Sequence, residues 1–180
     1  MTKDKKLLGD DRREWILNLL KGSGTPITGG ELATKTNVSR QVIVGDITLL
    51  KAKNEPIIAT SQGYMYLKAS SPIPLIERTI ACSHTPNEAE EELNLLVDHG
   101  VTVKDVRIEH PVYGDLTASI MVSNRQEVKQ FMKKVLSTKA SFLSELTEGI
   151  HLHTISASTE KALDEAENAL LKANFLIEYN

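Results

Sequence analysis

Two histidines alternate with apolar residues in the stretch of residues 149–155, which reads GIHLHTI. On a β-strand, successive side chains point to opposite faces, so His151 and His153 would share one face while Ile150 and Leu152 occupy the other. Two neighbouring imidazoles on one face can bind a metal ion or an anionic ligand. The alternative is a half-exposed strand with two solvated histidines, and the positions of the other histidines distinguish the two.

Hydrophobic patterning and turn residues divide residues 71–180 into alternating strands and helices. Strands are predicted over 76–83, 102–109, 115–122 and 150–156, with room for a short strand over 175–178. Helices are predicted over 86–98, 126–147 and 160–173. The resulting β-α-β-β-α-β order favours a ferredoxin-like fold of the mixed α/β (α+β) class. In that fold the first and second strands are parallel, the third lies between them, and the fourth pairs with the first.

This topology brings three histidines to one edge of the predicted sheet. His84 follows the first strand, His110 follows the second, and His151 begins the fourth strand, which runs the opposite way. His84 should therefore be a cross-strand neighbour of His151 and His153. Glu92 lies about two turns into the helix over 86–98 and borders its apolar stripe. From there its carboxylate can lean toward His84.

Three imidazoles and one carboxylate form a donor set that suits Zn²⁺, Ni²⁺ or Fe²⁺ and does not suit Ca²⁺ or Mg²⁺. Cys82 shares a strand face with His84 and is a reserve ligand, although a small buried thiol is the commoner role for such a residue. Cys82 is also the only cysteine, so no intrachain disulfide can form and a reducing compartment fits.

The composition is that of a soluble protein with a core, at 41% hydrophobic and 25% charged residues. No apolar run approaches the roughly 18 residues of a membrane span. The basic residues near the N-terminus are not followed by the apolar segment of a secretion signal. We therefore expect a cytoplasmic protein with no membrane partner.

The charge is distributed unevenly between two predicted domains, residues 1–70 and 71–180. The first carries eleven Lys and Arg against seven Asp and Glu, a balance of +4, and the second carries ten against seventeen, a balance of −7. Pro72 and Pro74 interrupt regular structure at the boundary. This difference in charge suggests that the first domain binds a polyanion and that the second domain does not.

The first domain has the order of a winged helix-turn-helix. A helix is predicted over 12–21, a second is opened by the capping box of Thr28 and Glu31, and Asn37 allows a tight turn. Ser39 then caps a third helix, which runs to about Lys51. Two short strands over 57–60 and 64–67 flank a turn that contains a glycine, which predicts a hairpin wing.

The third helix is the expected recognition helix, whose N-terminal residues reach base edges in the major groove. Arginine pairs with guanine and glutamine with adenine through two hydrogen bonds each. The predicted DNA contacts are Ser39, Arg40, Gln41, Val44 and Thr48. Gly45 lies on the same face at a cost of roughly 1 kcal/mol to the helix, which close approach to DNA or to a neighbouring helix would explain. The alternative is a winged helix used for protein contacts.

These motifs resemble those of bacterial nicotinate-responsive repressors of NAD biosynthesis, in which a winged-helix domain precedes a "3H" domain. The resemblance covers nearly the whole chain and rests on residues 39–44 (SRQVIV), 109–114 (EHPVYG), 148–155 (EGIHLHTI) and 175–178 (FLIE). It implies a metal held by His84, Glu92, His151 and His153, with His110 near the small-molecule pocket. Tyr113 and Gly114 would line the same mouth. Gly45 departs from the polar residue expected of the family, which puts the operator sequence in doubt.

The resemblance implies a ligand-gated repressor that is not an enzyme. A homodimer would present two recognition helices to a pseudo-palindromic operator, and nicotinic acid would act as co-repressor. Two alternatives remain from the residues themselves. The second domain could sense the metal itself, or it could be a metallohydrolase with Glu92 as general base. Against the enzyme, the sequence offers no acid/base pair beyond the ligands and no P-loop or nucleophile motif.

Overall fold

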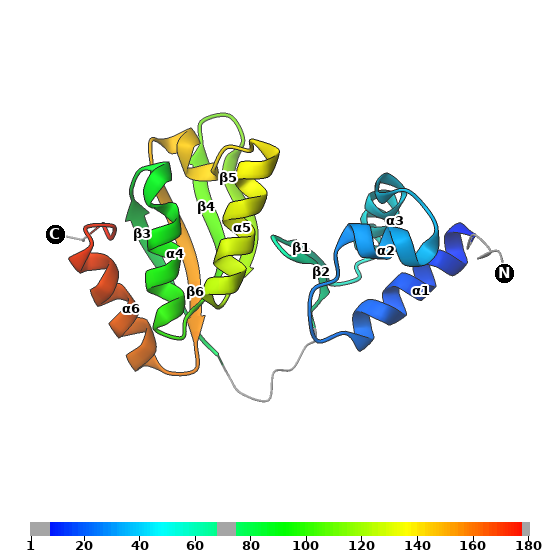
Figure 1. Ribbon diagram of the computed structural model, residues 1–180, viewed down its shortest axis with the longest axis horizontal. Helices are drawn as coiled ribbons and strands as arrows, with labels where there is room; N and C mark the ends of the chain where they lie inside the picture. Colours follow the sequence, from blue (N-terminus) through cyan, green and yellow to red (C-terminus); the bar gives the residue numbers. More distant parts are fainter. Residues whose placement is uncertain (1–7, 68–74, 178–180) are drawn as a thin grey trace. The chain divides into compact units, whose positions relative to one another are not determined.

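The computed structural model describes residues 8–67 and 75–177 of the chain. The chain divides into two compact units, residues 1–70 and 71–180, the same limits as those expected from the proline-containing boundary. Figure 1 labels the helices and strands of each unit. Among the described residues, no helix combines the length and the apolar character needed to cross a membrane.

The first unit contains three helices followed by a two-stranded sheet, as a winged helix requires. Its elements are α1 (Gly9–Gly22), α2 (Gly29–Thr36), α3 (Arg40–Ala52), β1 (Ile57–Thr60) and β2 (Gly63–Tyr66). Both predicted N-caps are present, since the Thr28 hydroxyl accepts the N–H of Glu31 and the Ser39 hydroxyl accepts the N–H of Val42. Asn37 ends α2 in the left-handed region, at φ 54°, and so makes the turn into α3.

The recognition helix α3 is fixed in the first unit by apolar and ionic contacts. Ile43 and Ile47 lie on its buried face, within a core that α1, α2 and β1 also supply. Beside them the Asp46 carboxylate accepts hydrogen bonds from Arg12 Nε at 2.6 Å and from Arg13 Nη1 at 3.1 Å. Because Arg12 and Asp46 are both buried, this pair ties α1 to α3 away from solvent.

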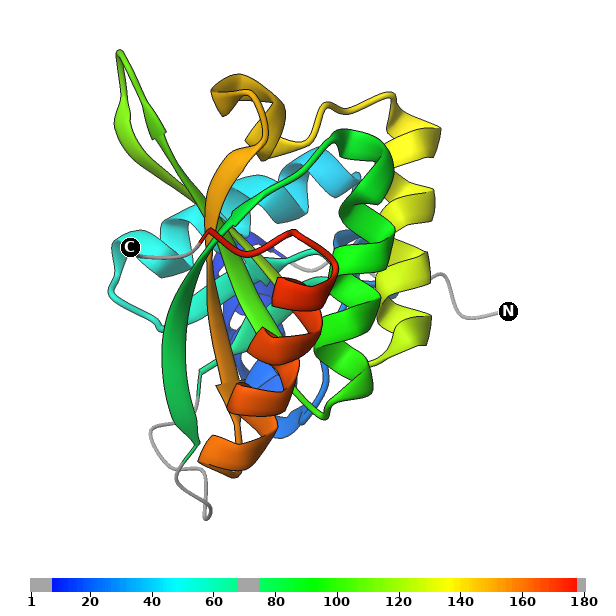
Figure 2. The ribbon, with the colours of Figure 1, turned by 90° about the vertical axis from the view of Figure 1, so that its left-hand side faces the viewer.

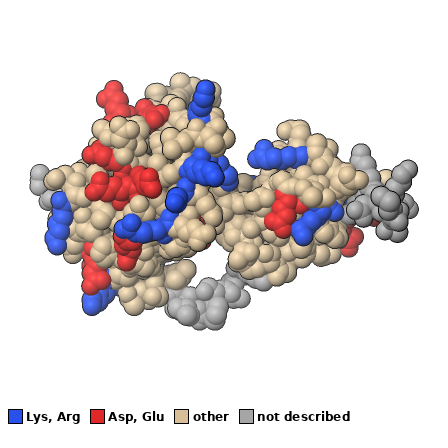
Figure 3. Space-filling view, viewed as in Figure 1, with Lys and Arg blue, Asp and Glu red and all other residues tan. Residues whose placement is uncertain are grey.

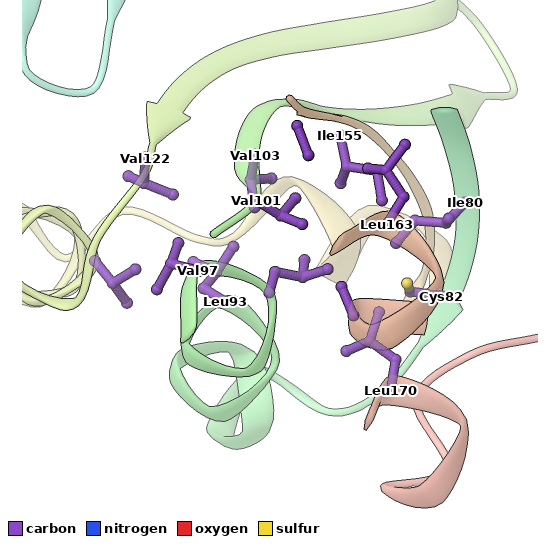
Figure 4. Close-up of a cluster of buried hydrophobic side chains, with 14 of the residues drawn as sticks. Ile80, Cys82, Leu93, Val97, Val101, Val103, Val122, Ile155, Leu163 and Leu170 are labelled. Carbon is purple, nitrogen blue, oxygen red and sulfur yellow. The ribbon is translucent and has the colours of Figure 1, made fainter. Parts of the chain in front are cut away.

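The second unit is a four-stranded sheet with helices on one face (Figure 2). Its elements are β3 (Ile76–Ser83), η1 (Pro86–Glu88), α4 (Ala89–Asp98), β4 (Thr102–His110), β5 (Gly114–Val122), α5 (Arg125–Thr138), η2 (Leu143–Thr147), β6 (Ile150–Ala157) and α6 (Glu160–Lys172). Apolar side chains from the helices and from one face of the sheet form its core, as Leu93, Val103, Ile155 and Leu163 illustrate in Figure 4.

The sheet order corrects the ferredoxin-like prediction. The predicted β-α-β-β-α-β succession and the α+β class are observed, but the strands lie in the order β3-β6-β4-β5. The last strand, β6, therefore occupies the position between β3 and β4 that the prediction gave to β5. Most of β6 is buried, and a strand of this kind gains from hydrogen-bonding partners on both sides. Since β6 is antiparallel to both neighbours, β3 and β4 are parallel as expected.

Two further predictions about the second unit were wrong in extent. The helix expected over 126–147 ends at Thr138, because Lys139 adopts a left-handed conformation at φ 53°. The Thr138 hydroxyl donates to the carbonyl of Lys134, a side-chain bond that competes with continued helix. At the C-terminal end, the described part of the expected strand over 175–178 is one bridge between Leu176 and Cys82, along the free edge of β3.

Candidate metal centre and DNA-binding surface

Three histidines and one glutamate converge in the second unit, within the space between the sheet and α4. The Nε2 atom of His84 lies 2.7 Å from Glu92 Oε2, and that of His153 lies 3.2 Å from the same oxygen. His151 Nε2 lies 3.3 Å from Glu92 Oε1 and 3.2 Å from His153 Nε2. All four side chains are buried. The structure thus brings together the four predicted metal ligands.

The pairing of β3 with β6 accounts for this convergence. In the antiparallel register Cys82 faces His151 and Ile80 faces His153, so His84 emerges just beyond the end of the pair. Gly149 makes the close approach of the two chains feasible. It has φ 96°, and a Cβ atom at this position would lie 2.4 Å from the carbonyl oxygen of His84.

Each imidazole of the cluster is oriented by a backbone carbonyl. The Nδ1 atoms of His84 and His151 both lie 2.8 Å from a carbonyl oxygen, of Thr85 and Gly149 respectively, and His153 Nδ1 lies 2.6 Å from that of Asp105. A carbonyl oxygen only accepts hydrogen bonds, so each Nδ1 carries a proton and donates it. Once a ring loses its Nε2 proton, it presents the Nε2 lone pair toward the centre of the cluster, which is how metal-ligating histidines are commonly held.

The electrostatics of the cluster favour charge separation between Glu92 and the imidazoles. Burial opposes ionisation of Glu92, but the surrounding histidines outweigh it and hold the pKa of the carboxyl well below its ordinary value. Burial also lowers the pKa of His84 and of His153, yet the Glu92 carboxylate raises both pKa values overall. Protons shared between the imidazole nitrogens and the Glu92 carboxylate thus hold the cluster together, and a divalent cation can replace such protons.

The donor set fits a transition-metal ion. Glu92 Oε1 is buried and accepts no hydrogen bond, although His151 Nε2 lies 3.3 Å from it. The Cys82 sulfur forms a group with one Glu92 oxygen and one His151 nitrogen in which all atoms lie within 4.8 Å of one another. Cys82 is therefore placed where a reserve ligand was expected. Burial strongly raises the pKa of its thiol, which favours the protonated form when no metal is bound.

A cavity of about 300 Å³ opens directly beside the cluster. His84, Glu92, His151 and His153 line it at one side, and most of the remaining wall is apolar, including Val106, Ala118, Ile120, Phe131, Val135 and Phe142. The lining contains no lysine or arginine. A small ligand with an aromatic ring would thus find apolar walls, while the cluster of His84, Glu92, His151 and His153 provides the polar groups.

Sequence reasoning missed most of this cavity. Residues 140–144 form one wall, and they belong to the stretch that was predicted to continue a helix. The break at Lys139 is what turns this segment over the cavity. A Ser-Thr-Lys sequence at residues 137–139 is only a weak signal for a helix end, because serine and threonine also occur within helices.

The predicted pocket residues His110, Tyr113 and Gly114 do not line this cavity. They lie at the turn of the β4–β5 hairpin, where the Tyr113 side chain is 74% exposed. The His110 Nδ1 atom accepts the backbone N–H groups of Val112 and Tyr113 at 3.2 and 3.3 Å. His110 therefore stabilises the hairpin turn, and it does not join His84, His151 and His153 in the lining of the cavity.

The predicted DNA contacts lie on one side of α3. Arg40, Gln41 and Thr48 are exposed, Val44 is partly buried beside them, and the Ser39 hydroxyl is engaged as the helix cap. Val42 and Leu49 are also exposed, and the prediction did not include them.

Gly45 shares this exposed side of α3. A Cβ atom added to it would meet nothing within 4 Å among the described residues, so no neighbouring helix requires a glycine there.

Each of the two units matches a known domain family. Residues 12–65 match the model of an HTH domain, and residues 77–179 match that of a 3H domain. The chain is 60% identical over 178 residues to "Transcription repressor NadR" of Bacillus subtilis, covering 98% of this chain and 99% of that protein. It is 38% identical over 173 residues to "Probable transcription repressor NiaR" of Thermotoga maritima, covering 96% of this chain and 97% of the relative.

Proposed function

This chain belongs to the family of transcription repressors that join a helix-turn-helix domain to a 3H domain, and from this premise we propose its target genes and its effector. We propose that it represses genes of NAD biosynthesis and nicotinate uptake, with nicotinic acid as co-repressor at a metal-containing second domain. The observation that carries the effector proposal is the buried cluster of His84, Glu92, His151 and His153 at the side of an apolar cavity.

Operator binding is the function of the first domain. Its exposed residues at the start of α3 have the chemistry to read base edges, since Arg40 and Gln41 can each form two hydrogen bonds to a base. We propose that the protein acts as a homodimer in the cytoplasm, in which two recognition helices would bind the two half-sites of a pseudo-palindromic operator. On this proposal, substitutions at Arg40 and Gln41 change the preferred operator sequence.

The four converging residues would hold a divalent transition metal, such as Ni²⁺, Zn²⁺ or Fe²⁺. When bound, the ion would supply a positive charge and an electron-pair acceptor at the polar side of the cavity. The carbonyls of Thr85, Gly149 and Asp105 keep the three imidazoles in the tautomer with a free Nε2 lone pair. The Glu92 carboxylate contributes the negative charge that a divalent cation requires.

Nicotinate suits this cavity through its ring and its charge. The ring can pack against the side chains of Phe131 and Phe142, which line the apolar wall. The carboxylate would enter a lining that contains no lysine or arginine, so a bound metal ion is the group that would offset its charge. We therefore expect nicotinate to bind only to metal-loaded protein and nicotinamide, which carries no charge, to bind much less.

Binding regulates transcription only if nicotinate prefers the protein conformation that binds DNA. The test is calorimetry of nicotinate against Zn²⁺-loaded protein, chelator-treated protein and the loaded double variant His151→Ala/His153→Ala. We expect binding in the first case alone. The double variant His99→Ala/His110→Ala, in which the histidines outside the cluster are removed, serves as the matched control and should bind normally. Equal nicotinate affinity of chelator-treated and Zn²⁺-loaded protein would refute the proposal that nicotinate binding requires the metal.

A metal sensor is the second candidate, because the cluster can supply five donors when Cys82 is included. Such a set could saturate a metal ion and leave no position for nicotinate, so that the metal itself would be the effector. Separate titrations of Zn²⁺ and nicotinate against DNA binding distinguish the two. The metallohydrolase alternative is not retained, because the relatives that span this chain are named as transcription repressors.

A further inference from the structure

One helix of the second unit carries three exposed cationic side chains in a single row. Arg125, Lys129 and Lys133 follow one another at intervals of four residues along α5, and we refer to them as the α5 basic stripe. Half of the ten lysines and arginines of residues 71–180 lie within residues 125–139, together with only one of the seventeen acidic residues. Lys and Arg side chains gather over α5 in Figure 3.

The α5 basic stripe is only partly neutralised within the unit. Arg125 donates from Nε to Asp98 at 2.6 Å, at the C-terminal end of α4. Lys129 and Lys133 are exposed and make no ion pair with any residue in ranges 8–67 and 75–177. Like charges four residues apart destabilise a helix by about 0.2–0.5 kcal/mol per pair. The stripe therefore does not serve the stability of α5.

The opposite side of α5 faces the cavity beside the metal cluster. Phe131 and Val135 line that cavity, and Val128 is the one residue of the helix that is fully buried. Thus α5 has one side on the proposed effector site and another side that presents cations to solvent.

The binding partner that fits the α5 basic stripe is the phosphate backbone of DNA. The family binds DNA through its first domain, so the second domain is carried close to a polyanion. Outside residues 125–139, this domain has five cationic against sixteen acidic residues, a balance of −11 that the phosphates would repel. Exposed ammonium groups in a row supply the attraction that phosphate contacts require.

We propose that α5 is a second DNA-contacting surface, on which Lys129 and Lys133 bind backbone phosphates next to the operator. These contacts add affinity without reading sequence. The second domain then touches DNA through one helix only, although its overall charge is negative. Because the same helix lines the cavity, an occupied cavity would fix α5 and strengthen these contacts, a consequence that rests on the proposed effector function.

The test is the salt dependence of DNA binding by the full chain and its variant Lys129→Gln/Lys133→Gln. The probe is a duplex that the wild-type protein selects from a random-sequence pool. The slope of log K against log salt concentration is negative, and each lost phosphate contact reduces its magnitude by about 0.9. The magnitude should therefore fall by roughly 1.8 for each bound protomer. The variant Lys129→Arg/Lys133→Arg keeps the charges and should retain the wild-type slope.

A matched control removes two exposed lysines from α6 through Lys161→Gln/Lys172→Gln, and we expect an unchanged slope. If both glutamine variants show the wild-type slope, the proposal is wrong. A weakened dimer with an unchanged slope would also overturn it, because the stripe would then contact a second copy of the chain. Repeating the titrations with nicotinate separates the DNA-contact proposal from the effector proposal. If the slope changes on substitution of Lys129 and Lys133 but not on addition of nicotinate, α5 contacts DNA and nicotinate does not strengthen that contact.

Discussion

Substitution of Gly149 by alanine should disrupt the buried cluster of His84, Glu92, His151 and His153 more than its own backbone strain explains. Gly149 has φ 96°, and an added Cβ would lie 2.4 Å from the carbonyl oxygen of His84. A left-handed conformation costs a non-glycine residue about 1–2 kcal/mol, and overpacking adds about 1–3 kcal/mol. The free energy of unfolding of the second unit should therefore fall by about 2–5 kcal/mol.

The same substitution should also weaken metal binding, because relief of the clash moves the chain that bears either His84 or His151. Gly100 offers a matched control: it has φ 74°, and an added Cβ would meet nothing within 4 Å. Gly100→Ala should cost only the backbone strain, about 1–2 kcal/mol, and leave the Zn²⁺ affinity unchanged.

Urea denaturation followed by circular dichroism measures both losses, while the fluorescence of Trp15, the only tryptophan, reports on the first unit alone. Competition with a chromophoric chelator gives the Zn²⁺ affinity of each variant. If Gly149→Ala and Gly100→Ala lose the same stability and both retain wild-type Zn²⁺ affinity, the close approach of the two chains does not position the ligands, and this reasoning is refuted.

Three further predictions concern the supports of the two sites. The Asp105 carboxylate accepts the backbone N–H of Thr154 at 3.0 Å, and the Asp105 carbonyl holds His153. Asp105→Ala should therefore lower the Zn²⁺ affinity about 10–100-fold, whereas Asp105→Asn, which keeps an acceptor oxygen, should retain the wild-type affinity. Gly45→Ala should raise the free energy of unfolding of the first unit by about 1 kcal/mol yet weaken DNA binding. Unchanged or tighter DNA binding would show that DNA does not closely approach α3 at this residue. Asp46→Ala leaves the buried Arg12 without its carboxylate and should cost about 3–5 kcal/mol in denaturation experiments; a loss below 1 kcal/mol would contradict the structural role of the pair.

The convergence of His84, His151 and His153 was predictable because it depends on strand direction and not on strand order. His84 ends one strand and His151 begins another that runs the opposite way, so the two meet wherever these strands are paired. The ferredoxin-like order was wrong, yet β3 and β6 are neighbours in both arrangements. Alternation along β6 placed His151 and His153 on one face, and that periodicity is a property of the sequence alone.

The pocket was less predictable because its walls depend on where elements stop. Lys139 adopts a left-handed conformation that ends α5 and turns residues 140–144 over the cavity. The sequence around Lys139 contains no glycine or proline from which this turn could be predicted. His110 was expected with the other histidines because it ends a parallel strand. In the structure, the turn of the β4–β5 hairpin uses its ring as a hydrogen-bond acceptor away from the cavity. These partners lie only two and three residues along the chain, and strand periodicity alone does not reveal them.

X-ray absorption spectroscopy of the Zn²⁺-loaded full chain tests most directly whether the buried cluster is a metal site. We predict one bound ion per chain, a first shell of nitrogen and oxygen donors at about 2.0–2.2 Å, and outer-shell scattering from three imidazole rings. The variant His151→Ala/His153→Ala should lose the bound ion. A spectrum of hydrated zinc without imidazole scattering, or an unchanged spectrum in the double variant, would contradict the account.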